Sequence, residues 1–267
     1  MAAAFGAKDV QKLRQMTGAG MMDAKRALDE NAGDMDAAAR WLREKGLAQS
    51  AKRSDRAADQ GAVSVANTGS VAAAVELRCE TDFVAKSPDF VALVQELADL
   101  VVAKGEDAVS EKSEAIDNMK ITLKENIEVG RVVRFEAAAG DALDAYLHAP
   151  SGPPGRNAVL VELAGGTPEL AHEIALHIAF GRPSVVHRDQ FSAEAVEAER
   201  DEILSETKNE GKPEQAIPKI VEGKLVGRFF AERVLLEQKF VRDPKMTIKQ
   251  LLADAKVTRF AQVEVGR

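Results

Sequence analysis

The chain has 267 residues, of which 45% are hydrophobic, 4% are aromatic and 30% are charged, and its formal net charge at pH 7 is -7. This length suits one large domain or about two to three small ones, and the scarcity of aromatic residues predicts a core built mainly of Ala, Val, Leu and Ile. The negative charge argues against nucleic acid as the main partner, because contacts to phosphates require a basic surface.

The composition also bears on the compartment in which the protein works. No stretch of the sequence approaches the length and apolarity of a transmembrane span, so no membrane partner is expected. The first residues lack the basic segment and the long apolar run of a signal peptide. Cys79 is the single cysteine, which excludes an intrachain disulfide and suits a reducing environment. We therefore expect a cytoplasmic protein.

Residues 1–50 are expected to form a small module of three helices. Apolar residues at helical spacing mark the first helix, and the glycine-rich run 17–20 separates it from the second. Asp34 can cap a third helix that ends at Gly46, and Trp41 is expected in the core. A unit of this size is suited to docking, because it is too small to enclose an active site.

The turn at 17–20 has two further properties. Met21 and Met22 follow it directly, and adjacent helix positions cannot both face one small core, so at least one of these adaptable side chains should be exposed. Gly18 and Gly20 begin a GxGxx pattern, but the turn follows a helix rather than a strand, which does not fit a dinucleotide site. The sequence contains no GxxxxGK[ST] loop, so no direct binding of GTP or GDP is expected.

Residues 51–62 are expected to be a linker, because they are rich in Ala, Lys, Arg and Asp and lack an apolar stripe. The basic residues of this linker have two interpretations: solvated charges or contacts to a partner. They are Lys52, Arg53 and Arg56.

Residues 63–140 are expected to form the first half of a core. A strand at 62–66 and a second strand that ends at Glu80 are separated by a turn-forming run. In the second strand apolar and charged residues alternate, which predicts a buried face with Cys79 and a solvent face with Glu76. Helices are then expected at 88–104 and 110–125, and a further strand at 131–137.

Residues 81–86, with the sequence Thr-Asp-Phe-Val-Ala-Lys, connect the strand that ends at Glu80 to the helix that begins after Ser87. Connections of this kind lie on the surface and often carry function. Phe83 within it has two interpretations. It either turns under the following helix as part of the core, or it projects and enters a pocket of a partner, where a buried aromatic residue dominates the binding energy.

Residues 141–191 repeat this arrangement, since two strands (144–148 and 158–164) are again followed by a capping residue, a proline and an amphipathic helix. The helix carries His172 and His177, which are five positions apart and therefore about 140° apart around the axis, too far for a zinc pair. His177 borders the apolar stripe of the helix. From the sequence it is either a histidine at the helix edge or a contact to a partner.

Residues 192–232 read as an antiparallel helical hairpin. Ser192 caps a charged helix, a short turn follows, and Pro218 lies in the first turn of the second helix or kinks it. Residues 233–267 are expected to contain an extended arm at 240–245, a short helix and a last strand at 260–265.

Four segments of the chain resemble, in the same order, the elongation factor Ts family of bacterial factors that release GDP from elongation factor Tu. They are 17–25, 81–86, 174–179 and 240–244. The resemblance implies an α+β fold with a UBA-like N-terminal module, a two-part core of antiparallel strands with packed helices, an inserted hairpin and a C-terminal module. It also implies guanine nucleotide exchange by conformational coupling, without enzymatic catalysis and without a cofactor.

The resemblance further implies which residues meet elongation factor Tu in its GDP-bound and nucleotide-free states. Thr81, Asp82, Phe83 and Val84 would wedge into the G domain and disturb its Mg²⁺ site. The other expected contacts are Leu13, Met21, Met22, Lys25, His177, Phe240 and Val241. In some members the hairpin mediates dimerisation, so a homodimer is a further hypothesis, and the C-terminal module is expected to be short.

Two alternatives belong to other functional classes. An enzyme is disfavoured, because the sequence offers no nucleotide loop, no metal-ligand cluster and no nucleophile with a matching base. An adaptor whose hairpin only joins chains would need no exchange activity. Stimulated release of GDP separates the exchange factor from the adaptor.

Overall fold

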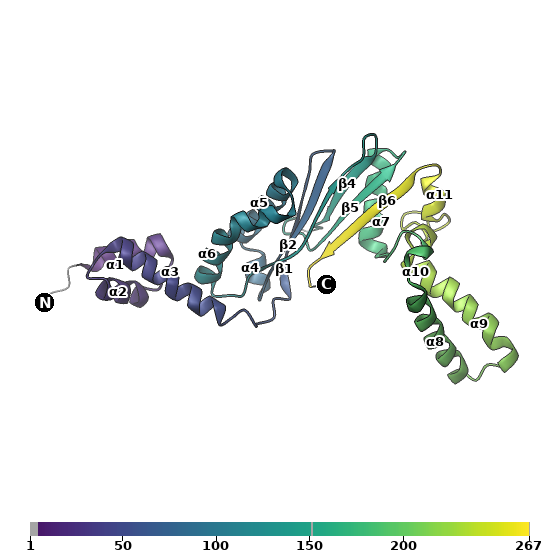
Figure 1. Cartoon of the computed structure of the whole chain (residues 1–267), viewed down its shortest axis with the longest axis horizontal. Helices are drawn as coiled ribbons and strands as arrows, with labels where there is room; N and C mark the ends of the chain where they lie inside the picture. The colour runs from purple at the N-terminus through teal and green to yellow at the C-terminus, as the bar shows by residue number, and fades with distance from the viewer. Residues whose placement is uncertain (1–4, 151, 267) are drawn as a thin grey trace.

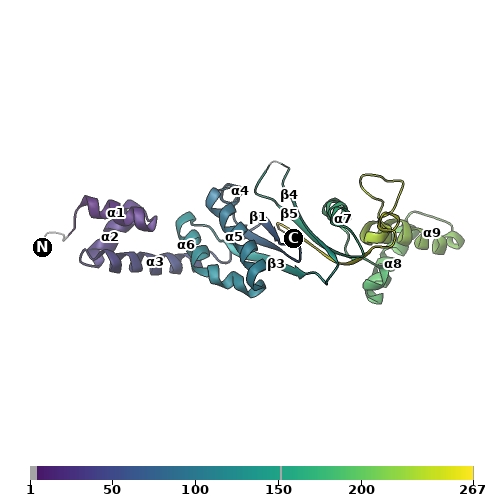
Figure 2. The same ribbon diagram turned by 90° about the horizontal axis from the view of Figure 1, so that it is seen from above.

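The computed structural model describes residues 5–150 and 152–266, while residues 1–4, 151 and 267 of the segments predicted above lie outside the described residues. The chain is elongated (Figure 1). A helical module lies at one end, two small sheets with their helices form the middle, and a helical hairpin lies at the other end. Figure 2 shows the same order from above. The mixture of helices and antiparallel sheets makes the fold α+β.

Within the described residues, the N-terminal module consists of the three predicted helices. They are α1 (Ala7–Thr17), α2 (Met21–Glu30) and α3 (Met35–Ala51). Asp34 caps α3 as predicted, since its carboxylate accepts hydrogen bonds from the backbone N–H groups of Asp36 and Ala37. Trp41 is half-buried at the edge of the module, with the Lys45 ammonium 4.6 Å from its ring centre, so smaller apolar side chains form the centre of the core.

Helix α3 continues to Ala51, so the prediction that it ends at Gly46 is wrong. At Gly46 the helix packs against α6 (Ser113–Leu123), where a β-carbon on the glycine would lie 2.7 Å from Cγ2 of Ile121. The glycine therefore permits a close contact between two helices.

The basic residues of the predicted linker are partly engaged within the chain. The Arg53 guanidinium donates to the backbone carbonyl of Lys120 at 3.0 Å, and Nη1 of Arg56 lies 3.4 Å from a carboxylate oxygen of Glu80. Lys52 is exposed. Arg53 and Arg56 therefore hold this segment against the core, so the interpretation of these residues as purely solvated charges is wrong.

The strands of the described residues form two three-stranded antiparallel sheets. The first has the order β1 (Gln60–Asn67), β2 (Val71–Cys79), β3 (Glu128–Glu136), and the second has the order β4 (Ala142–His148), β5 (Asn157–Ala164), β6 (Lys256–Glu264). Strand β6 pairs with β5, with Ala261 opposite Leu160. The end of the predicted segment 233–267 thus completes a sheet of the core.

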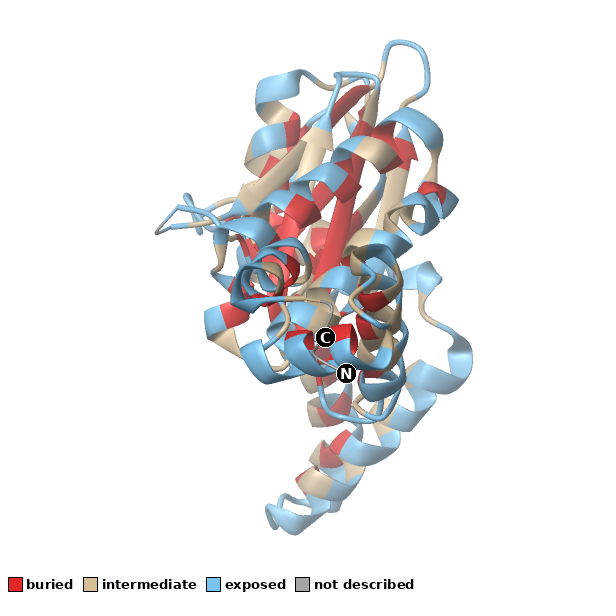
Figure 3. Cartoon of the chain, turned by 90° about the vertical axis from the view of Figure 1, so that its left-hand side faces the viewer, coloured by how far each residue is buried: buried red, intermediate tan, exposed pale blue. Residues whose placement is uncertain are grey.

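The two sheets pack face to face, and each carries a helix on its outer face. Helix α5 (Pro88–Lys104) covers the first sheet and α7 (Pro168–Gly181) covers the second. The inner faces meet in an apolar cluster that includes Val63, Ala74 and Leu160. Figure 3 shows the resulting core as a run of buried residues along the strands.

Strand β2 is buried on both faces, so the predicted solvent face of this strand is wrong. The alternation correctly identified the face under α5, including the buried Cys79. The other face is covered by the second sheet, and Glu76 on it is fully buried. The Glu76 carboxylate accepts hydrogen bonds from the backbone N–H groups of Arg131 (3.0 Å) and Gly266 (3.2 Å). These bonds offset the cost of burying its charge.

The hairpin contains α8 (Ala193–Asn209) and α9 (Ile217–Lys224), and α9 continues through a π-helical turn (Leu225–Phe230) into α10 (Ala231–Arg233). Pro218 lies in the first turn of α9, which is one of its two predicted positions. Ile203, Val221 and Phe229 are among the apolar side chains that join the two arms. The short helix α11 (Ile248–Leu252) precedes β6.

Candidate partner-binding site

Helix α4 (Asp82–Ala85) presents Phe83 to solvent immediately after β2. Thr81 caps this single turn, since its hydroxyl oxygen accepts a hydrogen bond from the backbone N–H of Val84 at 3.3 Å. Val84 and Ala85 are buried, so Val84 is a core residue rather than the expected direct contact, whereas Phe83 is 83% exposed. Of the two interpretations of Phe83, the structure confirms the one in which the ring projects. Its contact with a partner stays a prediction.

Asp82 stands next to Phe83 on the same turn. The Lys86 ammonium donates to the Asp82 carboxylate at 2.7 Å, and this hydrogen bond lowers the pKa of the Asp82 carboxyl group. Asp82 is therefore ionised at neutral pH. The turn offers a partner an apolar ring and a negative charge side by side.

Cys79, two residues before Thr81, takes no part in this surface. Burial, with a smaller contribution from the Glu125 carboxylate, raises the pKa of the Cys79 thiol to about 12. The thiol stays protonated at neutral pH, and reactivity depends on the thiolate. Cys79 therefore serves as a small buried side chain.

The N-terminal module exposes three of its four expected contacts. Met21 and Met22 are both exposed at the start of α2, as is Lys25. A groove of about 950 Å³ lies between the turn that precedes Met21, helix α3 and helix α6. Leu13, in contrast, is fully buried in the core of the module together with Leu28. Because a direct contact requires exposed atoms, we correct the role of Leu13 to that of a core residue.

His177 is also buried, with 2% of its surface exposed, so neither the helix-edge interpretation nor a direct contact fits it. Its Nδ1 accepts a hydrogen bond from the backbone N–H of Val241 at 3.3 Å, and its Nε2 lies 2.8 Å from Oε1 of Gln238. The buried Phe240 ring packs nearby, 6.1 Å between ring centres. His177 and Phe240 thus fix the arm to α7, so Phe240, like His177, is a buried packing residue rather than the expected direct contact. Val241 is the exposed residue of the three.

The buried His177 predicts a loss of stability in acid. Burial lowers the pKa of His177 below its ordinary value near 6.5, against a smaller opposing effect of the Gln238 hydrogen bond. Between the unfolded and the folded pKa the unfolded chain binds more protons, so the free energy of unfolding falls as the pH falls through this window. Urea unfolding at pH 7.5 and at pH 5 measures this fall in the free energy of unfolding.

The matched control for this pH dependence is His177→Gln, which keeps a polar side chain but cannot be protonated there. We expect the variant to lose less stability than the wild type between the two pH values. An equal loss in both proteins would assign the acid sensitivity to other groups.

Phe180 is a candidate contact that the sequence analysis missed. It is 75% exposed near the end of α7 and borders a cavity of about 660 Å³ with Pro150 and Pro154 on its wall. A signal was available, because Phe180 lies two positions after Ile178 and therefore on the opposite side of the helix from the apolar stripe. An exposed aromatic ring of this kind is typical of a binding surface.

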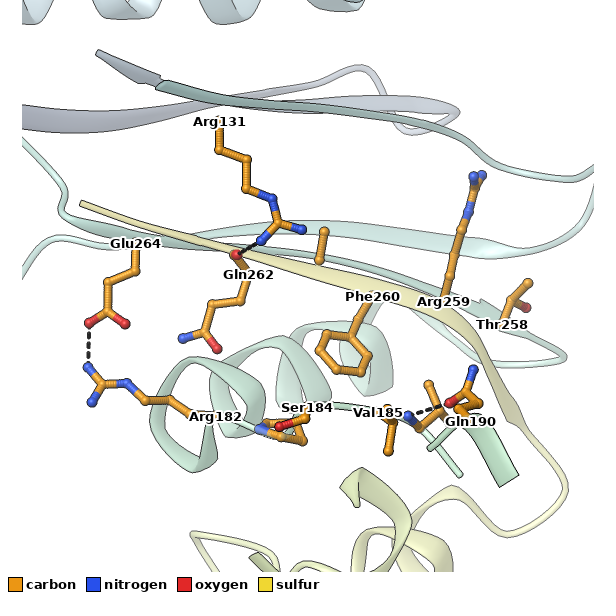
Figure 4. Close-up of a pocket in the computed structure, with 13 residues that line it drawn as sticks. Arg131, Arg182, Ser184, Val185, Gln190, Thr258, Arg259, Phe260, Gln262 and Glu264 are labelled. Carbon is orange, nitrogen blue, oxygen red and sulfur yellow. Dashed lines mark hydrogen bonds and ion pairs between the residues drawn. The ribbon is translucent and has the colours of Figure 1, made fainter. Parts of the chain in front are cut away.

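A cavity of about 450 Å³ lies between β6 and the segment that follows α7 (Figure 4). Three guanidinium groups line it, but each is engaged within the chain. Arg131 donates to the backbone carbonyl of Gln262, Arg182 pairs with Glu264, and Arg259 pairs with Glu162. The positive charges of this cavity are therefore committed to protein groups, which does not favour it as a phosphate site.

In the part of the chain that the structure describes, no group of three or more His, Cys, Asp or Glu side chains is placed to hold a metal ion. The same residues include no helix that combines the length and apolarity needed to cross a membrane. The candidate site is a set of exposed apolar side chains on an elongated scaffold, namely Phe83, Met21, Met22 and Phe180. Exposed apolar side chains of this kind are typical of proteins that bind other proteins.

Comparison with known proteins identifies the family. Residues 80–267 match the family model described as Elongation factor TS. The chain is 40% identical over 269 residues to elongation factor Ts of Deinococcus deserti, covering 97% of this chain and 99% of the relative. It is 42% identical over 275 residues to that of Clavibacter michiganensis (98% and 98%) and 44% over 279 residues to that of Kineococcus radiotolerans (99% and 99%). The chain belongs to the elongation factor Ts family.

Proposed function

We propose that this protein is a guanine nucleotide exchange factor for elongation factor Tu, and that α4 is the element that opens the nucleotide site. Membership of the elongation factor Ts family supports the exchange role. The observation that carries the mechanism is the exposed Phe83 beside the ionised Asp82, on a turn whose neighbours Val84 and Ala85 are anchored in the core. Because the turn is anchored, the Phe83 ring can enter a partner without a change in the position of the turn.

In this mechanism Asp82 and Phe83 enter the G domain of elongation factor Tu and displace the groups that hold its Mg²⁺. Loss of the cation removes the largest positive charge that balances the phosphates of GDP. If the rate of GDP release rises about 10⁴-fold, the differential binding energy is roughly 5.5 kcal/mol. Burial of one phenylalanine supplies about 2 to 3 kcal/mol. Further contacts are required, and Met21, Met22 and Phe180 are exposed to supply them.

Thermodynamic linkage gives a direct consequence of this mechanism. If the protein weakens the binding of GDP to elongation factor Tu, GDP must weaken the binding of the protein by the same factor. Equal affinity for the GDP-bound and the nucleotide-free partner would exclude the mechanism.

Further parts of the proposal follow the family resemblance. The described helices of residues 1–50 form a UBA-like module, 51–62 link it to the core, 63–140 and 141–191 are the two core subdomains, and 233–267 are the C-terminal segment. The hairpin 192–232 is a candidate for homodimerisation, which a sedimentation mass equal to one chain at micromolar concentration would exclude. The protein acts in the cytoplasm, on a protein partner, and the negative net charge supports a partner other than nucleic acid.

The experiment that tests the function is release of fluorescent GDP from purified elongation factor Tu in the presence of catalytic amounts of this protein. Acceleration over many turnovers supports an exchange factor. Stable binding without acceleration would instead identify an adaptor. Conversion of a small substrate in the absence of elongation factor Tu would identify an enzyme.

Phe180→Ala is expected to weaken binding to nucleotide-free elongation factor Tu about tenfold, because truncation of an aromatic residue in an interface commonly costs more than 1 kcal/mol. Titration of labelled partner measures this change. Phe180 is exposed, so the free energy of unfolding should change by less than about 0.5 kcal/mol. Val226→Ala, at an exposed apolar position of the hairpin, is the matched control and should bind like the wild type. Unchanged binding of the Phe180 variant would remove Phe180 from the interface.

A further inference from the structure

We propose that Glu125 is a positioning residue for nucleotide exchange, which holds the turn that carries Phe83 in the orientation needed to open the partner. The proposal rests on the role of Phe83 given above. Glu125 itself is only partly exposed, and it stands 42 positions along the chain from Phe83. It acts through Thr81 and the backbone that precedes α4.

Glu125 gathers three hydrogen bonds from the start of α4. One carboxylate oxygen accepts from the backbone N–H groups of Glu80 and Thr81, each at 3.1 Å. The other oxygen accepts from the Thr81 hydroxyl group at 2.6 Å. Thr81 in turn caps α4 through Val84, so a single carboxylate controls both the backbone and the capping side chain of this turn.

A second set of hydrogen bonds joins the same two segments with the roles reversed, since the segment before α4 now supplies the acceptor. The Glu80 carboxylate accepts from the backbone N–H of Asn126 at 2.7 Å. The side-chain amide of Asn126 donates to the backbone carbonyls of Ser54 (3.2 Å) and Arg56 (2.9 Å). Asn126 thereby connects three segments: the residues before α4, the residues after α6 and the segment after α3.

The sheet does not provide this support. Strand β1 pairs with β2 as far as Gln60 opposite Cys79, and β3 pairs with β2 as far as Glu128 opposite Arg78. Beyond Cys79 the ladder has ended, and the chain turns toward Phe83. The bonds of Glu125 begin one residue later, at Glu80. These bonds therefore hold the backbone where strand pairing has ended, directly before the turn that orients Phe83.

The helix that precedes Glu125 also contacts the N-terminal module. Arg43 of α3 lies 2.8 Å from the Glu114 carboxylate and donates to Asn118 at 2.8 Å, both on α6. The helices of the module thus contact α6 from Glu114 to Ile121, and the chain leads from the end of α6 through Glu125 to α4. A partner that docks on the module meets a Phe83 whose position is already fixed. Such preorganisation is expected to raise the rate of GDP release from the complex more than it raises the affinity of the complex.

Glu125→Ala should therefore reduce the maximal rate of GDP release more than it reduces affinity. Release of fluorescent GDP from elongation factor Tu is measured over a range of factor concentrations. We expect the maximal rate to fall about tenfold and the half-saturating concentration to change less than about threefold. Glu125→Gln, whose amide can still accept from the backbone and donate to Thr81, should stay within about twofold of wild type. Glu128→Ala, an exposed carboxylate nearby, should not change either value.

A double-mutant cycle tests whether Glu125 acts through Phe83. In a Phe83→Ala background, Glu125→Ala should slow release by less than about twofold, because the group that it positions is already gone. Additive losses, or a Glu125→Ala variant as fast as wild type, would overturn the proposal. If Phe83→Ala alone has no effect, the wedge fails and the proposal falls with it.

Circular dichroism melting of each variant shows whether it is folded. If Glu125→Ala does not fold, Thr81→Val replaces it in the cycle, since this change removes the hydroxyl link to Glu125, together with the cap on Val84, and leaves the backbone bonds to Glu125 in place. A slower release by Thr81→Val that disappears in the Phe83→Ala background supports the proposal. A loss that persists there contradicts it.

Discussion

Phe83→Ala is expected to slow factor-stimulated release of GDP from elongation factor Tu by roughly 30- to 150-fold, which corresponds to the loss of about 2 to 3 kcal/mol from the burial of one phenylalanine side chain. The ring is 83% exposed in the free protein, so its removal leaves the protein core unchanged. The lost binding energy should therefore appear in the complex with elongation factor Tu and in the transition state for GDP release. The free energy of unfolding should change by less than about 0.5 kcal/mol.

The measurement compares stopped-flow traces of fluorescent GDP release for wild type, Phe83→Ala and Phe83→Leu. Leucine restores part of the apolar volume, so its rate should lie between the other two. Val226→Ala serves again as the exposed apolar control. If all variants accelerate release equally, the exchange function stands but the work moves to the N-terminal module or to Phe180 and Val241. No acceleration by the wild type would favour the adaptor.

Sequence patterns predicted the features of the fold that depend on neighbouring residues. Helices α5 and α7 begin at the expected prolines, and Pro218 lies in the first turn of α9. Thr167 caps α7 with its side chain, whereas the Ser87 hydroxyl donates to the Val84 carbonyl and does not cap α5. The sequence allowed two interpretations of Phe83, and its projection follows from the burial of Val84 and Ala85, which join the core under α5 in its place. Local patterns identify an element and its apolar side, but they do not show what covers the other side.

The features that the sequence missed depend on segments far apart in the chain. Glu76 is buried because a second sheet, completed by β6 near the end of the chain, covers its face of β2. His177 is enclosed by the arm that carries Val241, 64 positions later. A family resemblance transfers the positions of such residues but not their exposure. The bonds between Glu125 and Thr81 leave no periodic signal at all, since neither residue belongs to a repeating pattern.

Gly130→Ala is expected to destabilise the protein by about 3 kcal/mol, because it would disturb the buried Glu76 carboxylate. A β-carbon at position 130 would lie 2.2 Å from Oε2 of Glu76. The carboxylate would have to move away from the backbone N–H groups of Arg131 and Gly266, which donate to it. Loss of a hydrogen bond to a charged group costs about 1.5 to 3 kcal/mol, and overpacking adds about 1 to 3 kcal/mol.

Urea unfolding of the variant at neutral pH measures this loss, and Gly223→Ala is the matched control. Gly223 lies in α9, where a β-carbon would meet nothing within 4 Å, so alanine there should be neutral or should stabilise the helix by up to about 1 kcal/mol. Equal stability of the two alanine variants would mean that the Glu76 carboxylate can shift without cost. A selective loss in Gly130→Ala would instead show that the buried charge, and the contact between the two sheets around it, tolerate no displacement.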